Sequence, residues 1–178
     1  VVESQDESVK EVFAREAKRV GVGAYEIIEP EQFLDCHYED GMQKFSFRTY
    51  RELKMHMIGI HQYENAAAAM LAAEAFFRSG AAGDFTEEEV HTAVRQGVVN
   101  ARWQGRMEIL RKEPFLLVDG AHNSNGVEAL KRSLMTLFPG EKFHFIMGVM
   151  ADKDYEKMVE ELLPLAIDFK TMTVEYER

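Results

Sequence analysis

The chain has 178 residues, of which 46% are hydrophobic and 29% are charged, and this balance excludes an intrinsically disordered protein. The longest run without a polar residue, Ala66–Ala73, has eight residues, far short of the about 20 that a membrane-spanning helix needs. The formal net charge of −10, from 21 Lys and Arg against 31 Asp and Glu, argues against general binding of nucleic acid, which requires a basic surface.

The first hundred residues contain three predicted helices and a group of short strands. Apolar residues at helical spacing predict helices over 8–20, 63–79 and 87–99, and the second of these is rich in alanine. Short apolar or alternating runs predict strands over 24–28, 45–47 and 53–57, while the polar segment 33–41 predicts a loop. The irregular stretch 100–106, which holds the only Trp, marks a domain boundary or hinge.

From residue 115 onward the predicted elements alternate between strands and helices. Strands are predicted over 115–118, 143–150 and 166–174, with helices over 124–138 and 155–163 between them. The run Phe115–Val118 is continuously apolar, which indicates a strand buried on both faces. The order strand, helix, strand, helix, strand with short links is typical of a parallel sheet with right-handed crossovers.

Further expectations concern the single cysteine, the location of the protein and the two ends of the chain. Cys36 has acidic neighbours that disfavour a thiolate, so we expect it to be inert. No intrachain disulfide is possible and no secretory signal is visible, so we expect a cytoplasmic protein. We also expect a monomer. The chain begins at Val1 rather than Met and ends in a charged stretch, which leads us to expect a piece of a longer protein.

The turn Asp119-Gly-Ala-His-Asn123 is the strongest candidate site that the residues alone provide. It follows a predicted strand and precedes a predicted helix, and ligands of open parallel sheets bind at such carboxyl ends. Asp119 would present a carboxylate to a ribose or a cation, and His122 would supply a donor or acceptor at the same rim. The alternative is a capped turn in which Asn123 or Ser124 only satisfies backbone groups at the helix start.

Other candidates are weaker when taken singly. Arg106 lies beside a Trp and a Gly and could bind phosphate, or be an ordinary surface arginine. Asn65 could contact a purine or cap its helix. The segment Asp152–Asp154 could line the same crevice or cap the following helix. No phosphate-binding G-x-x-x-x-G-K-[ST] loop, G-x-G-x-x-G turn or metal-binding histidine spacing occurs. The residues alone therefore indicate about half of a nucleotide-binding crevice and no catalytic group.

Four motifs together resemble one family, the folylpolyglutamate and dihydrofolate synthases of the Mur ligase superfamily. Gly59-Ile-His-Gln-Tyr-Glu-Asn65 is similar to G-x-H-Q-x-x-N-A, and Trp103-Gln-Gly-Arg-Met-Glu108 to W-P-G-R-x-E. Asp119-Gly-Ala-His-Asn-Ser-Asn-Gly126 is similar to D-G-A-H-N-P-x-G, and Gly148-Val-Met-Ala-Asp-Lys-Asp-Tyr155 to G-x-x-x-D-K-D. Gln104 and Ser124 replace two prolines of the family pattern without removing a polar group.

The resemblance implies an α/β fold in two parts. Residues 1–100 would be the C-terminal part of the ATP-binding domain, and residues 101–178 a truncated Rossmann-like C-terminal domain with a mainly parallel sheet. The phosphate-binding loop and the Mg²⁺ ligands would lie in an N-terminal part outside this chain, so no metal ligand is expected within it.

The implied activity is ATP-dependent ligation of L-glutamate to folate or dihydropteroate through an acyl phosphate, with the fragment inactive alone. By the family pattern Asn65, Arg106 and Asp119 contact ATP, at the adenine, the phosphates and the ribose respectively, and His122 is catalytic or orients the substrate. Lys153 and Asp154 stay undecided. Two alternatives remain at this point, a non-catalytic nucleotide-binding module of the same fold and, from the sheet pattern alone, a nicotinamide-dependent oxidoreductase.

Overall fold

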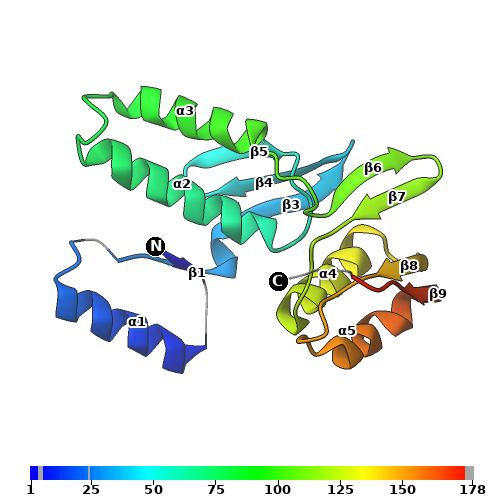
Figure 1. Ribbon diagram of the computed structural model, residues 1–178. Coiled ribbons are helices and arrows are strands. Elements are labelled where there is room, and N and C mark those ends of the chain that lie inside the picture. Colours follow the sequence, from blue (N-terminus) through cyan, green and yellow to red (C-terminus); the bar gives the residue numbers. More distant parts are fainter. Residues whose placement is uncertain (4–5, 24, 175–178) are drawn as a thin grey trace. The chain divides into compact units, whose positions relative to one another are not determined.

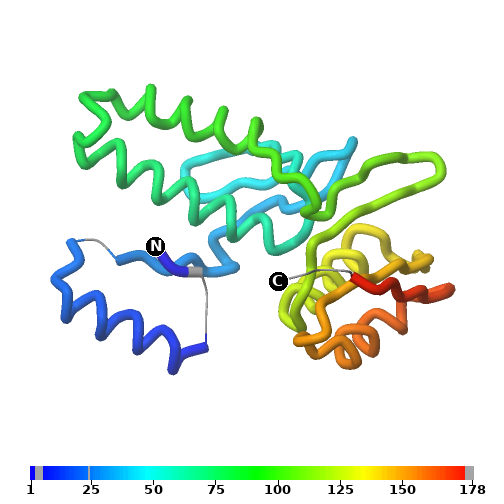
Figure 2. Tube along the Cα trace, viewed as in Figure 1, coloured from blue at the N-terminus to red at the C-terminus, as the bar shows by residue number. Residues whose placement is uncertain are grey.

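A computed structural model describes residues 1–3, 6–23 and 25–174 of the chain, which forms two compact units (Figures 1 and 2). The first unit comprises Val1–Met57 and Gln62–Arg102, and the second comprises Ile58–His61 and Trp103–Arg178. The short segment Ile58–His61 is therefore separated by sequence, but not by packing, from the rest of the second unit.

In the part of the chain that the structure describes, the first unit combines a small antiparallel sheet with three α-helices. Its elements are β1 (Val2–Glu3), α1 (Glu7–Val20), β2 (Ile27–Ile28), β3 (Phe33–Glu39), β4 (Met42–Phe47), β5 (Tyr50–Met55), α2 (Gln62–Arg78) and α3 (Glu87–Asn100). Strands β3, β4 and β5 form an antiparallel sheet in that order, while β1 and β2 pair in parallel. Helix α3 packs on β5 and on α2. The three predicted helices are thereby confirmed.

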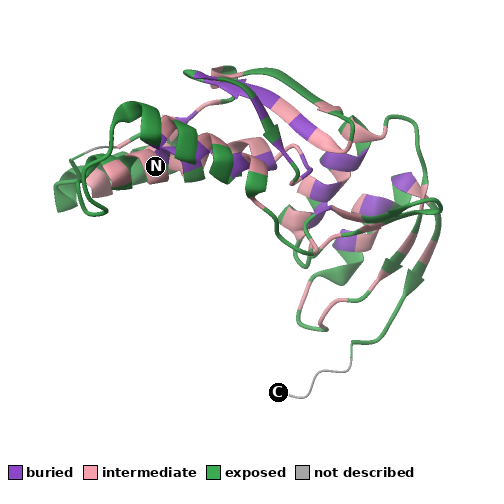
Figure 3. Ribbon diagram, turned by 90° about the horizontal axis from the view of Figure 1, so that it is seen from above, coloured by how far each residue is buried: buried purple, intermediate pink, exposed green. Residues whose placement is uncertain are grey.

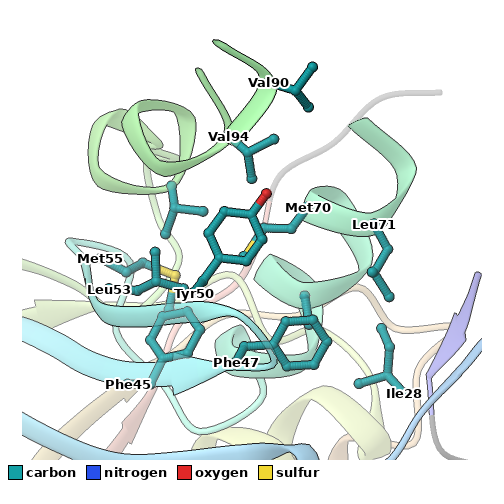
Figure 4. Packing of buried hydrophobic residues seen from close by; sticks show 12 residues of the cluster. Ile28, Phe45, Phe47, Tyr50, Leu53, Met55, Met70, Leu71, Val90 and Val94 are labelled. Atoms are coloured by element: carbon teal, nitrogen blue, oxygen red, sulfur yellow. The ribbon is translucent and has the colours of Figure 1, made fainter. Parts of the chain in front are cut away.

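The core of the first unit lies between β4, β5 and helices α2 and α3 (Figures 3 and 4). Phe45 and Phe47 alternate along β4, so both rings reach the same face of the sheet and are 1% exposed. Helix α3 covers this face with Val90, Val94 and Val98, which recur every fourth residue and therefore share one side of the helix. Alternation and helical spacing in the sequence thus locate this core correctly.

The prediction of a loop over 33–41 is wrong, because residues 33–39 form strand β3. Among the described residues this strand lies at the edge of the sheet, and its partner there is β4. Most of its side chains, such as those of Leu34 and Cys36, are exposed, so the sequence carries no alternation of apolar and polar residues to reveal a strand. The strand predicted over 24–28 is shorter than expected, spanning Ile27–Ile28, and residue 24 lies outside the described residues.

The second unit contains two pairs of strands and two helices. Its elements are β6 (Glu108–Lys112), β7 (Phe115–Val118), α4 (Ser124–Leu137), β8 (Phe143–Met147), α5 (Tyr155–Leu162) and β9 (Ala166–Thr171). Strands β8 and β9 pair in parallel, as predicted, and α4 packs on α5. The α/β class predicted from the sequence is confirmed.

Strand β7 differs from its prediction in partner and in burial. It pairs antiparallel with β6, which the sequence analysis did not predict, and within the described residues this pair forms a two-stranded sheet separate from β8 and β9. Leu116 is 43% exposed, so the expectation of a strand buried on both faces is wrong. The physical reason is that a two-stranded sheet leaves one edge of β7 unpaired and much of its surface uncovered.

Candidate functional site

The turn after β7 and the loop Trp103–Met107 meet through hydrogen bonds within the second unit, one between backbone groups and one to the Asp119 side chain. The carboxylate of Asp119 accepts from the Met107 amide through Oδ2 and from the Ala121 amide through Oδ1, each at 2.8 Å. The Gly120 amide donates to the Gly105 carbonyl at 2.7 Å. The two segments that the sequence analysis singled out separately, around Arg106 and Asp119, are therefore one local structure.

The third member of this structure is the segment Ile58–His61. The Ile60 amide donates to the buried hydroxyl of Ser133 on α4 at 3.1 Å, which ties the segment to the second unit. Gly59 has a φ of +119°, and a Cβ built there would lie 2.8 Å from His61 Cε1 and 3.0 Å from Met107 Sδ. The absence of a side chain at Gly59 thus lets the imidazole of His61 and the fully buried Met107 pack against this backbone.

His61 is the titratable group of this site whose pKa the surroundings shift. Burial lowers the pKa of His61, the Asp119 carboxylate raises it, and the Arg106 guanidinium lowers it further, with a net shift below the ordinary 6.5. His61 is therefore neutral at pH 7 and interacts electrostatically with both predicted ligand residues.

The lowered pKa of His61 predicts a pH dependence of stability. Below pH 6.5 the unfolded chain binds a proton at His61 more readily than the folded chain, so the free energy of unfolding falls as the pH drops from that value. We expect His61→Gln to flatten this part of the dependence, measured by urea unfolding between about pH 7.5 and pH 5.5. Equal slopes for the variant and the parent chain would contradict the role of His61.

Of the remaining residues, Asn123 caps helix α4, whereas His122 and Arg106 are exposed. Asn123 is the N-cap of α4, where its Oδ1 accepts from the Gly126 amide at 2.8 Å, so the capping interpretation holds for this residue. His122 is exposed and its Nδ1 lies 2.9 Å from the Gly120 carbonyl oxygen. Arg106 is also exposed, between Gly105 and Met107.

Asn65 and the segment Asp152–Asp154 are far from this turn in the sequence. Asn65 belongs to the first unit, in the first turns of α2, where its Nδ2 donates to Gln62 Oε1 at 3.1 Å. Asp154 occupies the N-cap position of α5 but makes no side-chain cap, and Lys153 pairs with Asp152 at 3.2 Å. The second unit therefore brings together Arg106, Asp119 and His122, while Asn65 is placed only within the first.

With this geometry established, the chain can be compared with known proteins. A family model described as Mur ligase, glutamate ligase domain, matches residues 105–175. The dihydrofolate synthase/folylpolyglutamate synthase of Bacillus subtilis (strain 168) is 34% identical over 128 residues, which cover 70% of this chain and 29% of that protein. The chain belongs to the folylpolyglutamate and dihydrofolate synthase family.

Solved structures of this family have the same fold. An FPGS–AMPPCP–folate complex matches with a TM-score of 0.80 at 23% identity, over 98% of this chain and 42% of that one. Mycobacterium tuberculosis folylpolyglutamate synthase complexed with ADP matches with a TM-score of 0.75 at 26% identity, over 94% of this chain and 37% of that one. The chain thus spans less than half the length of these synthases, so the activity of a whole protein is a matter for proposal.

Two residues of the site were missed by the sequence analysis although they stood inside its motifs. His61 is part of the family segment Gly59–Asn65 and interacts with both Arg106 and Asp119. Glu108 ends the segment that begins at Trp103, and its Oε2 accepts from the Gly105 amide at 2.8 Å. In the motifs that this chain resembles, His61 stands at a fixed sequence spacing from Asn65, and Glu108 at a fixed sequence spacing from Arg106. This spacing is the signal that could have found both residues.

Neither a metal site nor a membrane span is found in the part of the chain that the structure describes. Among residues 1–3, 6–23 and 25–174, no three His, Cys, Asp or Glu side chains are grouped so that they could hold a metal ion. Within the same ranges, no helix combines the length and the apolar character that crossing a bilayer requires.

Proposed function

We propose that the complete gene product carrying this chain is an ATP-dependent ligase that joins L-glutamate to folate, to dihydropteroate, or to both. The observation that carries the proposal is the single structure formed by the Arg106 loop, the Asp119 turn and the His61 segment, each of which is a motif of the synthase family. The related structures with ADP and with AMPPCP and folate support an adenine nucleotide and a folate as ligands.

The proposed reaction has two steps. The substrate carboxylate attacks the γ-phosphorus of ATP, so that an acyl phosphate forms and ADP leaves. The amine of glutamate then attacks the acyl carbon, an amide forms with loss of a proton, and inorganic phosphate leaves. Both steps need a cation near the phosphates and exclusion of water from the acyl phosphate.

The residues of this chain receive distinct roles in the proposal. Arg106, exposed and with both neighbours held by hydrogen bonds, binds phosphate oxygens through its guanidinium. Asp119 faces the ribose, Asn65 contacts the adenine, and His122, at the exposed end of the same turn, orients the substrate or acts as a catalytic group.

The organisation of the protein is part of the same proposal. Residues 1–100 belong to the ATP-binding domain and residues 101–178 to the C-terminal ligase domain. The ligands of the Mg²⁺ that accompanies the nucleotide lie outside the described residues. The reaction takes place in the cytoplasm, with the protein acting as a monomer.

The experiment that tests the function is the release of ADP by the complete gene product. We expect release only when ATP, glutamate and a folate or dihydropteroate are all present, and separate assays with the two acceptors show which glutamate is added. The chain of residues 1–178 alone is expected to release none. Nucleotide binding without release in any combination would instead support a non-catalytic nucleotide-binding module.

A further inference from the structure

Both carboxylate oxygens of Asp119 accept hydrogen bonds from backbone amides of the second unit. One carboxylate oxygen accepts from the Met107 amide and the other from the Ala121 amide, both at 2.8 Å. Hydrogen bonds to a charged acceptor are among the stronger ones in proteins. The carboxylate thus links the start of the turn after β7 to the residue that follows Arg106.

A second pair of hydrogen bonds holds the residue that precedes Arg106. The Gly105 carbonyl accepts from the Gly120 amide at 2.7 Å, and the Gly105 amide donates to Glu108 Oε2 at 2.8 Å. A Cβ at Gly120 would lie 3.3 Å from the Gly105 carbonyl oxygen, so the two backbones approach closely. The backbone at Arg106 is therefore held from both sides, through Gly105 and through Met107.

The loop contains a residue, Met107, with an unfavourable backbone conformation. Met107 has a φ of +46°, in the left-handed region that residues other than glycine rarely adopt. Its side chain is fully buried and its amide is bonded to Asp119. Such a conformation persists only where the surroundings impose it, so loss of the Asp119 acceptor should release Met107 toward an ordinary conformation and move Arg106 with it.

We propose that Asp119 is a positioning residue, which holds the loop Gly105–Met107 so that the Arg106 guanidinium is presented in a fixed place. The part played by the guanidinium rests on the proposed function, whereas the positioning itself does not. A guanidinium held in place before the anion arrives loses less conformational freedom on binding, which favours affinity and orientation. Asp119 thereby acts through Arg106, in addition to any contact with the ribose.

The positioning can be tested without nucleotide, by ¹⁵N relaxation of the chain of residues 1–178. In Asp119→Asn the side-chain amide can accept from one of the two backbone amides but opposes the other with its own donors. We expect the order parameter of the Arg106 amide to fall from about 0.85 to below about 0.6. Glu108→Ala, which removes the bond to Gly105 and leaves Asp119 intact, should lower it as well, while Asp84→Asn, a matched change in the first unit, should not.

An unchanged order parameter in Asp119→Asn would overturn the proposal, provided that the far-ultraviolet circular dichroism matches that of the parent chain. If Asp119→Asn does not fold, Asp119→Glu, which keeps the charge but moves the carboxylate oxygens by one methylene, decides the question by the same criterion. Failure of the proposed ligase activity would leave this measurement intact, so the two proposals fail separately.

Turnover in the complete gene product then separates positioning from a ribose contact. We expect Asp119→Asn to lower ADP release about 5-fold in the parent protein and less than about 2-fold when Arg106 is already alanine, because one effect passes through the other. The same about 5-fold loss should appear with 2′,3′-dideoxy-ATP, which has no ribose hydroxyl to lose. Equal losses with and without Arg106, together with no loss for the dideoxy nucleotide, would contradict positioning.

Discussion

Replacing Arg106 with alanine is expected to lower the rate of ADP release by a factor of about ten or more in the complete gene product. The guanidinium forms charge-assisted hydrogen bonds with phosphate oxygens in the proposed function, and a tenfold loss corresponds to about 1.4 kcal/mol, within the range of one such contact. Initial rates at saturating folate and glutamate, with varied ATP, provide the measurement.

Arg111→Ala is the matched control for this change. Arg111 is an exposed arginine of β6 in the same unit, where its Nε donates to the Pro114 carbonyl at 3.3 Å, away from the Asp119 turn. Its replacement should leave the rate within about twofold, as for most surface substitutions. Normal turnover in Arg106→Ala would remove Arg106 from the proposed phosphate site.

The second large effect is expected on stability, from Gly59→Ala. The φ of +119° is strained for alanine, and the new methyl group would lie 2.8 Å from His61 and 3.0 Å from Met107. We expect a loss of about 2 kcal/mol in the free energy of unfolding, in line with other strained backbone positions. Urea unfolding monitored by circular dichroism measures the loss as a lower midpoint.

Gly97→Ala provides a control of opposite sign. Gly97 lies in the interior of α3, and a Cβ there would meet no atom within 4 Å. Alanine has the higher helix propensity, so this variant should be more stable by about 0.5–1 kcal/mol. A Gly59→Ala midpoint equal to or above that of the parent chain would show that the close packing around Gly59 does not restrict this position.

The sequence predicted the parts of the fold in which side-chain burial follows the period of the element. Val90, Val94 and Val98 identify the inward side of α3, and the alternation of Phe45 and Phe47 identifies β4, because both elements cover a core with one face. Two strands whose side chains are mostly or largely exposed were not predicted. Strand β3 is exposed and was taken for a loop, and β6, rich in charged residues, was not predicted at all.

The candidate site was predictable in its residues but not in its internal contacts. Motif likeness identified Arg106 and Asp119, and the family membership supports that likeness. Nothing in their spacing indicated that Asp119 accepts from the Met107 amide, because this bond depends on the left-handed backbone at Met107, which residue type does not predict. The roles of Asn65, Arg106, Asp119 and His122 toward ATP stay predictions.

The segment Ile58–His61 has a consequence for how this protein can be divided. The polypeptide passes from one unit to the other three times, after Met57, after His61 and after Arg102. A deletion variant that starts at Trp103 would therefore leave behind the amide that bonds Ser133 and the glycine that lies against Met107. The second unit therefore cannot be produced as residues 103–178 alone. A version of it made as a separate protein would need residues 58–61 joined to it through a designed linker.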